Sequence, residues 1–257
     1  MKVVTSAREL PSACAFVPTM GALHAGHGSL FAIAAEHASD VVASIFVNPL
    51  QFENQEDLQK YPRTPERDIE LAEKFGVTHL WLPRYEEIYP TDFKKITAGP
   101  ISKLYEGASR PGHFDGVVTV VRRLFDLVKP RVAIFGEKDF QQLTLIREIA
   151  AEVEIIAAPI IRESDGLAMS SRNVRLTETG RSAAQVISRA LRESESQAEL
   201  RAILESEAEF TVDYADYIDE ATFSTPTKST QFTRAIVAGW INGVRLLDNM
   251  AVKSEAK

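Results

Sequence analysis

Two histidines, His24 and His27, stand three positions apart in a loop that contains two glycines. The loop follows a short apolar run at residues 13–17 and precedes an apolar stretch at residues 30–35 whose length and spacing suit a helix. The first backbone N–H groups of a helix lack internal partners and favour anions. Two imidazoles add donors that can follow charge as it moves between phosphate oxygens. The pattern therefore indicates a phosphate site at a strand-to-helix junction.

Other interpretations fit the same loop. Gly21 and Gly26 have the spacing of a Walker A motif, but His27 and Gly28 stand where that motif requires Lys and Ser or Thr. The two histidines could instead hold zinc, yet the chain has one cysteine and no His/Cys cluster nearby for the remaining ligands. Two solvent-facing loop histidines are the simplest alternative, and spacing alone does not decide between them.

Two further polar segments follow apolar runs. Lys138, at a second strand-to-helix junction (residues 136–142), would meet phosphate as a point charge, and Gln142 would hydrogen-bond a hydroxyl or carboxylate. Asn48 and Gln51 are neutral amides beside apolar side chains, and they could position a small polar substrate without the desolvation cost of a buried charge. A solvated helix cap explains Lys138 equally well in isolation.

A polar loop at residues 164–173 contains two hydroxyls and a guanidinium in a row, Ser170, Ser171 and Arg172. Such groups suit a phosphate that is gripped only during reaction, and we expect the loop to be flexible. An ordinary Ser/Asn-rich linker has the same composition, so both interpretations stay open on these residues alone.

The composition excludes several functional classes. With 257 residues, 45% hydrophobic and 25% charged, the chain has room for one large or two ordinary globular domains. Its net charge of −7 argues against a general nucleic-acid or anionic-membrane surface. No apolar run reaches the length of a membrane span, and residues 1–9 lack the apolar segment of a signal peptide. Cys14, the single cysteine, excludes an internal disulfide, suits a reducing cytoplasm and is expected in the core.

The first two thirds of the sequence alternates predicted strands with predicted helices. Residues 41–47 form a β-branched run typical of a strand buried on both faces. Thr64 and Pro65 fit the N-cap and first position of a helix ending at Gly76. This alternation predicts a doubly wound, Rossmann-like parallel α/β sheet whose ligands bind beyond the carboxyl ends of the strands. The other expected elements are strands at residues 79–82, 132–135, 155–157 and 160–161, and helices at residues 117–128 and 140–151.

The character of the chain changes near Thr177. We therefore expect a first domain over residues 1–176 and a smaller α+β domain over residues 177–250, with a frayed tail at residues 251–257. Asn242-Gly243 is a strong hairpin signal. The elements expected in the second domain are helices at residues 180–192 and 198–210, and strands at residues 214–218, 235–238 and 244–247.

Taken together, the polar segments resemble a known family. The chain is similar, in the same order, to the signature blocks of the pantothenate synthetase (pantoate–β-alanine ligase) family. These are nucleotidyltransferases with a His-x-Gly-His motif, related to class I aminoacyl-tRNA synthetases. The resemblance runs from about Phe16 to Asn173 and continues weakly to Asn249. The matching blocks are residues 17–27, 46–52, 61–64, 107–114, 136–142 and 165–173.

The resemblance implies an ATP- and Mg²⁺-dependent ligation in two steps. The carboxylate of pantoate attacks the α-phosphorus of ATP, giving pantoyl adenylate and pyrophosphate. The amine of β-alanine then attacks the acyl carbon, releasing AMP and pantothenate. It also implies a cytoplasmic homodimer, because the family is usually dimeric. No nucleic-acid or membrane partner is expected.

The resemblance also assigns residues. His27 is the expected proton donor, and the further catalytic candidates are His24, Lys138, Ser171 and Arg172. Gln51 and Gln142 are placed on pantoate, with Gln51 also near β-alanine and Asn48 as a third substrate-binding candidate. Asp68, with Asp139 as an alternative, is expected to reach the Mg²⁺ carried by the ATP phosphates. Residues expected around ATP are Met20, Gly21, Ala22, Leu23, His24, Ala25, Gly26, His27, Gly136, Glu137, Lys138, Asp139, Ile161, Met169, Ser170, Ser171 and Arg172.

Three positions depart from the family pattern. The segment before Phe16 is short, so the first helix is expected to be clipped, and Ala25 stands where an acidic residue is common. Gly28 replaces a large apolar residue, and glycine early in a helix costs about 1 kcal/mol relative to alanine, which would loosen the turn that carries His27.

Two alternatives to the ligase remain. An adenylyltransferase of the same superfamily would act on a different small acid or a phosphate monoester, although a phosphate would call for more basic residues than Asn48, Gln51 and Gln142 supply. A nucleotide-binding module without catalysis would keep the fold alone. The intact set of His, Lys, Ser and Arg candidates argues against the second alternative.

Overall fold

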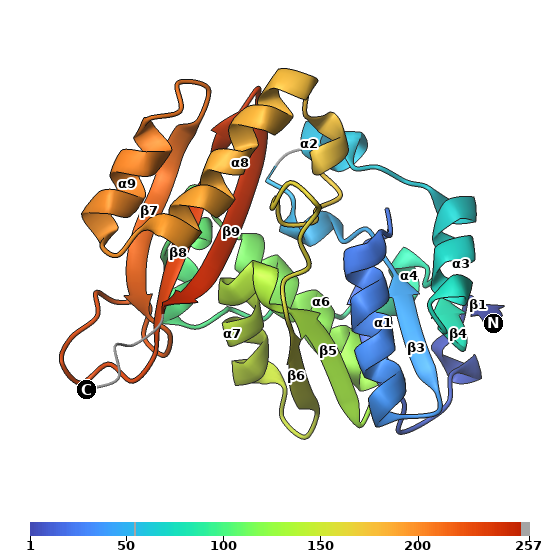
Figure 1. Ribbon diagram of the computed structural model, residues 1–257. Helices are drawn as coiled ribbons and strands as arrows, with labels where there is room; N and C mark the ends of the chain where they lie inside the picture. Colours follow the sequence, from blue (N-terminus) through green and yellow to red (C-terminus); the bar gives the residue numbers. More distant parts are fainter. Residues whose placement is uncertain (54, 253–257) are drawn as a thin grey trace. The chain divides into compact units, whose positions relative to one another are not determined.

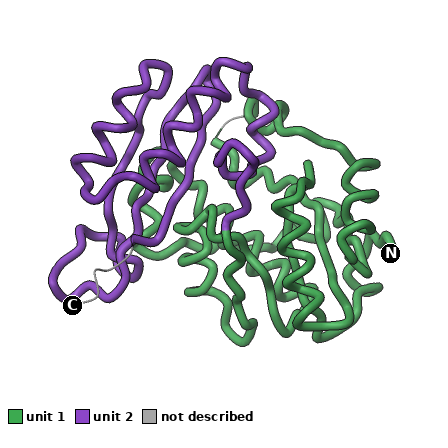
Figure 2. The backbone as a smooth tube through the Cα atoms, viewed as in Figure 1, with its two compact units in different colours: residues 1–159 green, residues 160–257 purple. Residues whose placement is uncertain are grey.

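Two compact units make up the chain, residues 1–159 and 160–257 (Figure 2). The computed structural model describes residues 1–53 and 55–252. Residues 160–176 are compact with the second unit, partly because the guanidinium of Arg162 pairs with Asp248 at 2.5 Å. The sequence placed the division after residue 176, where the character of the chain changes, and that domain boundary stays a prediction.

The first unit is built on a six-stranded sheet in which every strand pair is parallel, in the order β1-β4-β3-β2-β5-β6 (Figure 1). Strand β3 (Val41–Ile45) is buried at its first four positions, as the β-branched run predicted. The doubly wound α/β prediction is confirmed. The other strands are β1 (Lys2–Val4), β2 (Ala15–Thr19), β4 (His79–Trp81), β5 (Val132–Gly136) and β6 (Glu154–Ala158).

The direction of winding reverses between β2 and β5, which pair with each other at the centre of the sheet. After β2 the chain continues through α1 to β3 on one side. After β5 it continues through α7 to β6 on the other side. Loops that leave two such strands diverge, and the crevice between them is where parallel sheets bind ligands. The loops that carry the two histidines and Lys138 follow these two strands.

Helices of the first unit pack on the sheet. Helix α1 (Ala25–His37) contacts β2, β3 and β5 and also α3, whereas α6 contacts α7 (Figure 1). None of the helices among the described residues is long and apolar enough to span a membrane. The remaining helical segments are η1 (Ala7–Glu9), η2 (Pro49–Gln51), α2 (Gln55–Lys60), α3 (Pro65–Lys74), α4 (Tyr85–Ile88), η3 (Pro100–Lys103), α5 (Glu106–Ser109), α6 (His113–Val128), η4 (Glu137–Asp139) and α7 (Phe140–Ile149).

Two expectations for the strands were wrong. Residues 160–161 are not a strand, and the nearest pairing is an isolated bridge between Arg162 and Ala168. The N-terminal segment forms β1, which pairs with β4, and this strand was not expected because three residues carry too little periodicity to identify it.

The second unit is an antiparallel sheet with two helices on it, as predicted for the C-terminal region. Asn242 and Gly243 have φ of 50° and 73°, the left-handed pair that a two-residue hairpin requires. The expected frayed tail was wrong for Ala251 and Val252, which pair with β8, while residues 253–257 lie outside the described residues. The elements are η5 (Asn173–Arg175), α8 (Glu178–Glu193), α9 (Gln197–Glu205), β7 (Thr211–Asp219), β8 (Thr233–Ile241) and β9 (Val244–Val252).

Gly28 has a packing role that the sequence did not reveal. It is buried in the first turns of α1, and a Cβ placed there would lie 2.7 Å from three carbons of the Phe75 ring, which follows α3. Such a contact is closer than carbon atoms tolerate, so only glycine lets the ring lie against the helix. The expectation that Gly28 loosens the His27 turn was incomplete, because the ring occupies the space of the missing side chain.

We therefore predict that Gly28→Ala destabilises the protein despite the higher helix propensity of alanine. Overpacking typically costs about 1–3 kcal/mol, more than the gain of about 1 kcal/mol in propensity. Phe75→Leu should lose core packing alone, and the double variant should be more stable than the sum of the two single effects. Urea unfolding of the four proteins measures the coupling, and additive effects would contradict the predicted contact.

Candidate active site

The loop between β2 and α1 is held by a buried carboxylate. Gly21 and Ala22 both have left-handed backbones, with φ of 86° and 51°. The backbone N–H groups of Ala22 and Leu23 turn toward Asp68 of α3: Ala22 N donates to Oδ2 at 2.9 Å and Leu23 N to Oδ1 at 2.7 Å. A Cβ at Gly21 would lie 3.0 Å from Asp68 Oδ2, so the approach also needs glycine. Asp68 is 1% exposed.

Thr64 supports the same carboxylate. The sequence placed Thr64 as the N-cap of α3, and the position is correct. Its hydroxyl does not cap the helix backbone, however, and donates to Asp68 Oδ1 at 3.0 Å instead. The carboxylate therefore accepts two backbone bonds and one hydroxyl bond. This is the hydrogen bonding that a buried charge requires.

His24 and His27 cap the start of α1 reciprocally. His24 is the N-cap, and its Nδ1 accepts a hydrogen bond from Gly26 N at 3.1 Å. His27 Nδ1 accepts one from His24 N at 3.3 Å, and the two ring centroids lie 4.2 Å apart. The anion site expected from bare N–H groups is therefore partly wrong, because side chains of the loop occupy several of these donors.

This capping determines which ring nitrogen carries the proton. A nitrogen that accepts a hydrogen bond has no proton of its own. Both rings accept through Nδ1, so each neutral imidazole has its proton on Nε2. The two rings therefore offer Nε2–H donors on a helix that begins at the carboxyl end of β2.

Lys138 and Asp139 lie close enough to the histidine loop to affect the pKa of His27. Burial of the His27 ring lowers its pKa to about 3, and electrostatic interactions with His24 and Lys138 act in the same direction, while Asp139 opposes them. Charges shift a pKa only over short distances, so η4 lies beside the histidine loop. Lys138 and the two histidines are thus close together in the first unit, and their sharing of one functional site stays a prediction.

Asn48 and Gln51 form a second group of polar residues at the end of β3. Asn48 Nδ2 donates to Gln51 Oε1 at 2.9 Å and to the backbone oxygen of Gly116 at 3.1 Å. Asn48 Oδ1 accepts from the Tyr89 hydroxyl at 2.7 Å and from Leu50 N at 3.2 Å. With Oε1 held in this way, the Gln51 amide nitrogen is oriented as a donor for a ligand.

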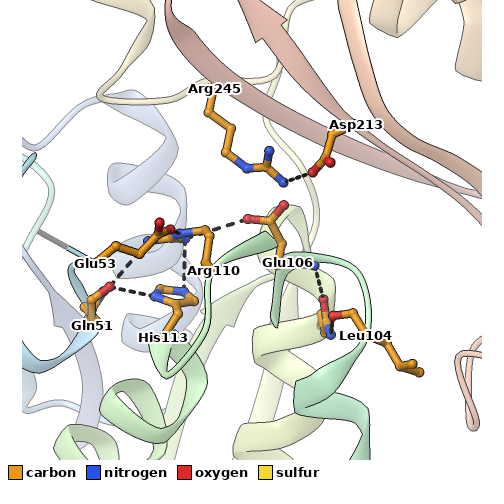
Figure 3. Close-up of polar contacts among 9 residues, drawn as sticks. Gln51, Glu53, Leu104, Glu106, Arg110, His113, Asp213 and Arg245 are labelled. Carbon is orange, nitrogen blue, oxygen red and sulfur yellow. Dashed lines mark hydrogen bonds and ion pairs between the residues drawn. The ribbon is translucent and has the colours of Figure 1, made fainter. Parts of the chain in front are cut away.

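A buried cluster fixes the backbone of Gln51 (Figure 3). His113 Nδ1 donates to Gln51 O at 2.8 Å, and His113 Nε2 accepts from Arg110 at 3.1 Å. The Arg110 guanidinium also pairs with Glu53 at 3.3 Å and Glu106 at 3.7 Å. No short-range signal identifies this cluster, although Arg110 and His113 lie in one of the family-like blocks.

The two neighbouring glutamines of α7 have different surroundings. Gln141 is buried, and its side chain holds three backbone groups: it accepts from Glu106 N and donates to Ile101 O and Leu104 O. The side chain of Gln142 is partly exposed and makes no hydrogen bond to another described residue. Gln142, the residue that the sequence selected, is therefore the one available to a substrate.

The polar loop of the second unit is held by its own hydrogen bonds. Met169 N donates to Ile161 O at 2.9 Å, and Ser170 Oγ accepts from Arg172 N at 3.2 Å. Asn173 Nδ2 donates to Glu163 at 2.8 Å and to Ala168 O at 3.0 Å. The expected flexible loop is thus a hydrogen-bonded segment. Ile161 and residues 169–172 belong to this unit, so their contact with ATP stays a prediction.

Metal-binding groups are sparse. Within residues 1–53 and 55–252, no three His, Cys, Asp or Glu side chains are grouped so that they could hold a metal ion. Both carboxylate oxygens of Asp68 accept hydrogen bonds from backbone N–H groups. Asp139 is exposed and is the N-cap of α7.

Comparison with known proteins decides the family. The sequence pattern of pantoate–β-alanine ligase matches residues 1–251. The chain belongs to the pantoate–β-alanine ligase family. It is therefore an amide-forming ligase that condenses pantoate with β-alanine using ATP, and nothing in the comparisons favours the adenylyltransferase alternative.

Similar sequences and structures agree over nearly the whole chain. Pantothenate synthetases of Acidothermus cellulolyticus and Stenotrophomonas maltophilia are 45% and 46% identical, over 93% and 92% of this chain and 85% and 90% of theirs. The Thermus thermophilus enzyme has a TM-score of 0.92 at 42% identity, covering 97% of this chain and 99% of its own. A Francisella tularensis ligase, solved with β-γ ATP and β-alanine, has a TM-score of 0.84 at 34% identity. The match covers 98% of this chain and 97% of that ligase.

The lowered pKa of His27 predicts a pH-dependent stability. Between pH 6.5 and about 3 the unfolded histidine binds a proton that the folded ring does not, so the unfolding free energy of the wild type should fall as the solution is acidified. Replacing His27 by Gln should remove up to about 1.4 kcal/mol per pH unit of this slope. Denaturant unfolding from pH 7 to 4 measures it. His37→Gln, at the other end of α1, is the control, and equal slopes in wild type and His27→Gln would contradict the prediction.

Proposed function

We propose that this ligase works through a pantoyl adenylate. A carboxylate oxygen of pantoate attacks the α-phosphorus of ATP, and the bond from that phosphorus to the bridging oxygen breaks, releasing pyrophosphate. The β-alanine amine then attacks the acyl carbon, the carbon–oxygen bond to AMP breaks, and the amine loses a proton. Adenylation is needed because a free carboxylate is a poor electrophile. The first step joins two anions, so the site must stabilise negative charge.

The reciprocal capping of His24 and His27 is the observation that carries this proposal. It directs two Nε2–H donors from the end of β2, with the ammonium of Lys138 at the neighbouring strand. Because the pKa of His27 is lowered to about 3, the ring is neutral near pH 7. We therefore propose that His27 stabilises the phosphates as a hydrogen-bond donor and keeps its proton. The loop residues 20–27 and 136–139 would surround ATP.

Pantoate, the substrate acid, would be bound by side-chain amides. Gln51 would donate its amide N–H to pantoate and lie near β-alanine, with Asn48 holding its oxygen and Gln142 contacting pantoate from α7. The Francisella tularensis relative was solved with β-γ ATP and β-alanine, which supports the nucleotide and the amine substrate. Ile161 and Met169 would contribute to the ATP site from the second unit, with Ser170, Ser171 and Arg172 contacting its phosphates.

Magnesium would be carried by the triphosphate of ATP. Mg²⁺ usually keeps several waters and takes one or two carboxylates together with phosphate oxygens. The described residues offer no preformed cage, which fits an ion that arrives with the nucleotide. Asp139 is the exposed candidate on the first unit, whereas the carboxylate of Asp68 faces the backbone. The ion would neutralise the phosphate charge.

We also propose a cytoplasmic homodimer. The dimer is supported by the family alone. The cytoplasm is supported by the cysteine content, because a single cysteine cannot form an internal disulfide. Cys14 itself is buried, and burial raises its thiol pKa to about 12. Such a thiol stays protonated and unreactive. Analytical ultracentrifugation tests the dimer directly.

The overall activity is tested by omission. The enzyme is incubated with ATP, Mg²⁺, pantoate and β-alanine, and each component is left out in turn. AMP and pantothenate should form only in the complete mixture, while pyrophosphate should form without β-alanine in an amount close to that of the enzyme. AMP release that ignores β-alanine would contradict the proposed sequence of steps.

Loss of a phosphate donor should slow adenylate formation. We predict that His27→Ala and Lys138→Ala each reduce the single-turnover rate by roughly 10²- to 10³-fold, as for removal of one preorganised transition-state donor. His37→Ala and Lys103→Ala, on α1 and η3, are the matched controls and should react at the wild-type rate. Wild-type rates in both test variants would overturn these roles.

A second prediction concerns pantoate. Gln51→Glu keeps an oxygen for Asn48 Nδ2 but replaces the donor amide by a negative charge, so the KM for pantoate should rise roughly 10- to 100-fold. Gln59→Glu makes the same charge change at an exposed position of α2 and should leave the KM for pantoate unaltered. An unchanged KM for pantoate in Gln51→Glu would place the acid elsewhere.

A further inference from the structure

Asp68 is buried in α3, and its described contacts include neither a cation nor an exposed group. It is 1% exposed, and its three donors are Ala22 N, Leu23 N and Thr64 Oγ1. A carboxylate in such a place needs these bonds, because burying a charge without them is very unfavourable. Two of the three belong to the loop that ends at His24. The contact therefore joins α3 to the catalytic loop.

The loop could not keep its shape by local preference. Ala22 has a left-handed φ of 51°, which L-residues other than Asn and Asp avoid, and it follows a glycine at φ 86°. Successive residues in such conformations present their N–H groups to one anion. In many proteins that anion is a bound phosphate. Here it is a carboxylate of the chain itself, so the N–H groups of Ala22 and Leu23 are taken before any nucleotide arrives.

We propose that Asp68 is a positioning residue for the reaction: its carboxylate holds the backbone of residues 21–23 so that the Nε2–H groups of His24 and His27 face the phosphates. The proposal rests on the phosphate-binding role proposed for the two histidines. His24 N, which donates to His27 Nδ1, directly follows Leu23 in the chain. A shift of Leu23 N would therefore disturb the bond that sets the His27 tautomer.

A direct metal-ligand role for Asp68 is the competing assignment, and it predicts different measurements. A ligand to Mg²⁺ would make the reaction need more Mg²⁺ after substitution, and excess Mg²⁺ would restore the rate. A positioning residue would lower the adenylation rate at every Mg²⁺ concentration. A purely structural residue would lower the unfolding temperature without changing the rate of the protein that remains folded.

Asp68→Asn is the decisive variant because it keeps the shape and replaces one acceptor oxygen by a donor that faces a backbone N–H. We expect the single-turnover adenylation rate to fall roughly 10- to 100-fold, as for misplacement of catalytic groups. The Mg²⁺ concentration at half-maximal rate should stay within twofold of wild type. Glu70→Gln makes the same charge change on an exposed face of α3 and should behave as wild type.

A second readout does not depend on activity. In ¹H–¹⁵N correlation spectra of the imidazoles, both His24 and His27 should show the Nε2–H tautomer in wild type and Glu70→Gln, and a mixture of tautomers in Asp68→Asn. This measurement stands even if wild type makes no pantoyl adenylate, so failure of the ligase assignment is separable from failure of this proposal.

Thr64→Val covers the case in which Asp68→Asn does not fold. It removes only the hydroxyl bond to Asp68 at a position whose side chain caps no backbone group. We expect a smaller fall in the adenylation rate, roughly two- to fivefold, with the same unchanged Mg²⁺ requirement. Rates within a factor of two of wild type in the folded variants, unaltered tautomers, or rescue by excess Mg²⁺ would each overturn the proposal.

Discussion

The competition for backbone N–H groups at the start of α1 governs the chemistry of this protein. A loop that enters a helix has several such donors, and a nucleotide phosphate is one acceptor that can take them. In this chain the acceptors are internal: Asp68 takes two, and the imidazoles of His24 and His27 take two more. In the proposed function, phosphate is therefore recognised by the ring nitrogens of these histidines and not by the backbone, and the rings can also follow charge as it moves.

The strand order of the parallel sheet determines which other loops lie beside the two imidazole rings. Because β2 pairs with both β3 and β5, the loops after all three strands open at the same edge. The histidines follow β2, the amide pair of Asn48 and Gln51 follows β3, and Lys138 follows β5. The topology thus places the residues proposed to bind phosphate beside those proposed to bind the substrate acid. The buried Arg110–His113 cluster adds rigidity beneath the amide pair.

Sequence patterns predicted strands β2 to β6 and the winding of the first unit because the alternation of strands and helices depends on local spacing, whereas the short strand β1 was missed. The contacts that could not be predicted join distant positions. Asp68 reaches Ala22 from α3, and Tyr89 reaches Asn48 from the position that follows the short helix α4, a segment with no distinguishing motif. The tautomers of the histidines likewise depend on capping geometry that no spacing encodes. Thr64 shows the same limit, since its position was correct and its hydrogen bond was not.

The Gly28–Phe75 contact also constrains how this sequence can diverge. Because the Phe75 ring packs directly on the helix backbone at Gly28, the residues at these two positions must change together in evolution. They nevertheless lie in different helical segments of the sequence. A lineage could acquire a bulky side chain at position 28 only after, or together with, a smaller residue at position 75. Chimeric enzymes that take these two segments from different parents would meet the same incompatibility, however well each segment folds in its own background.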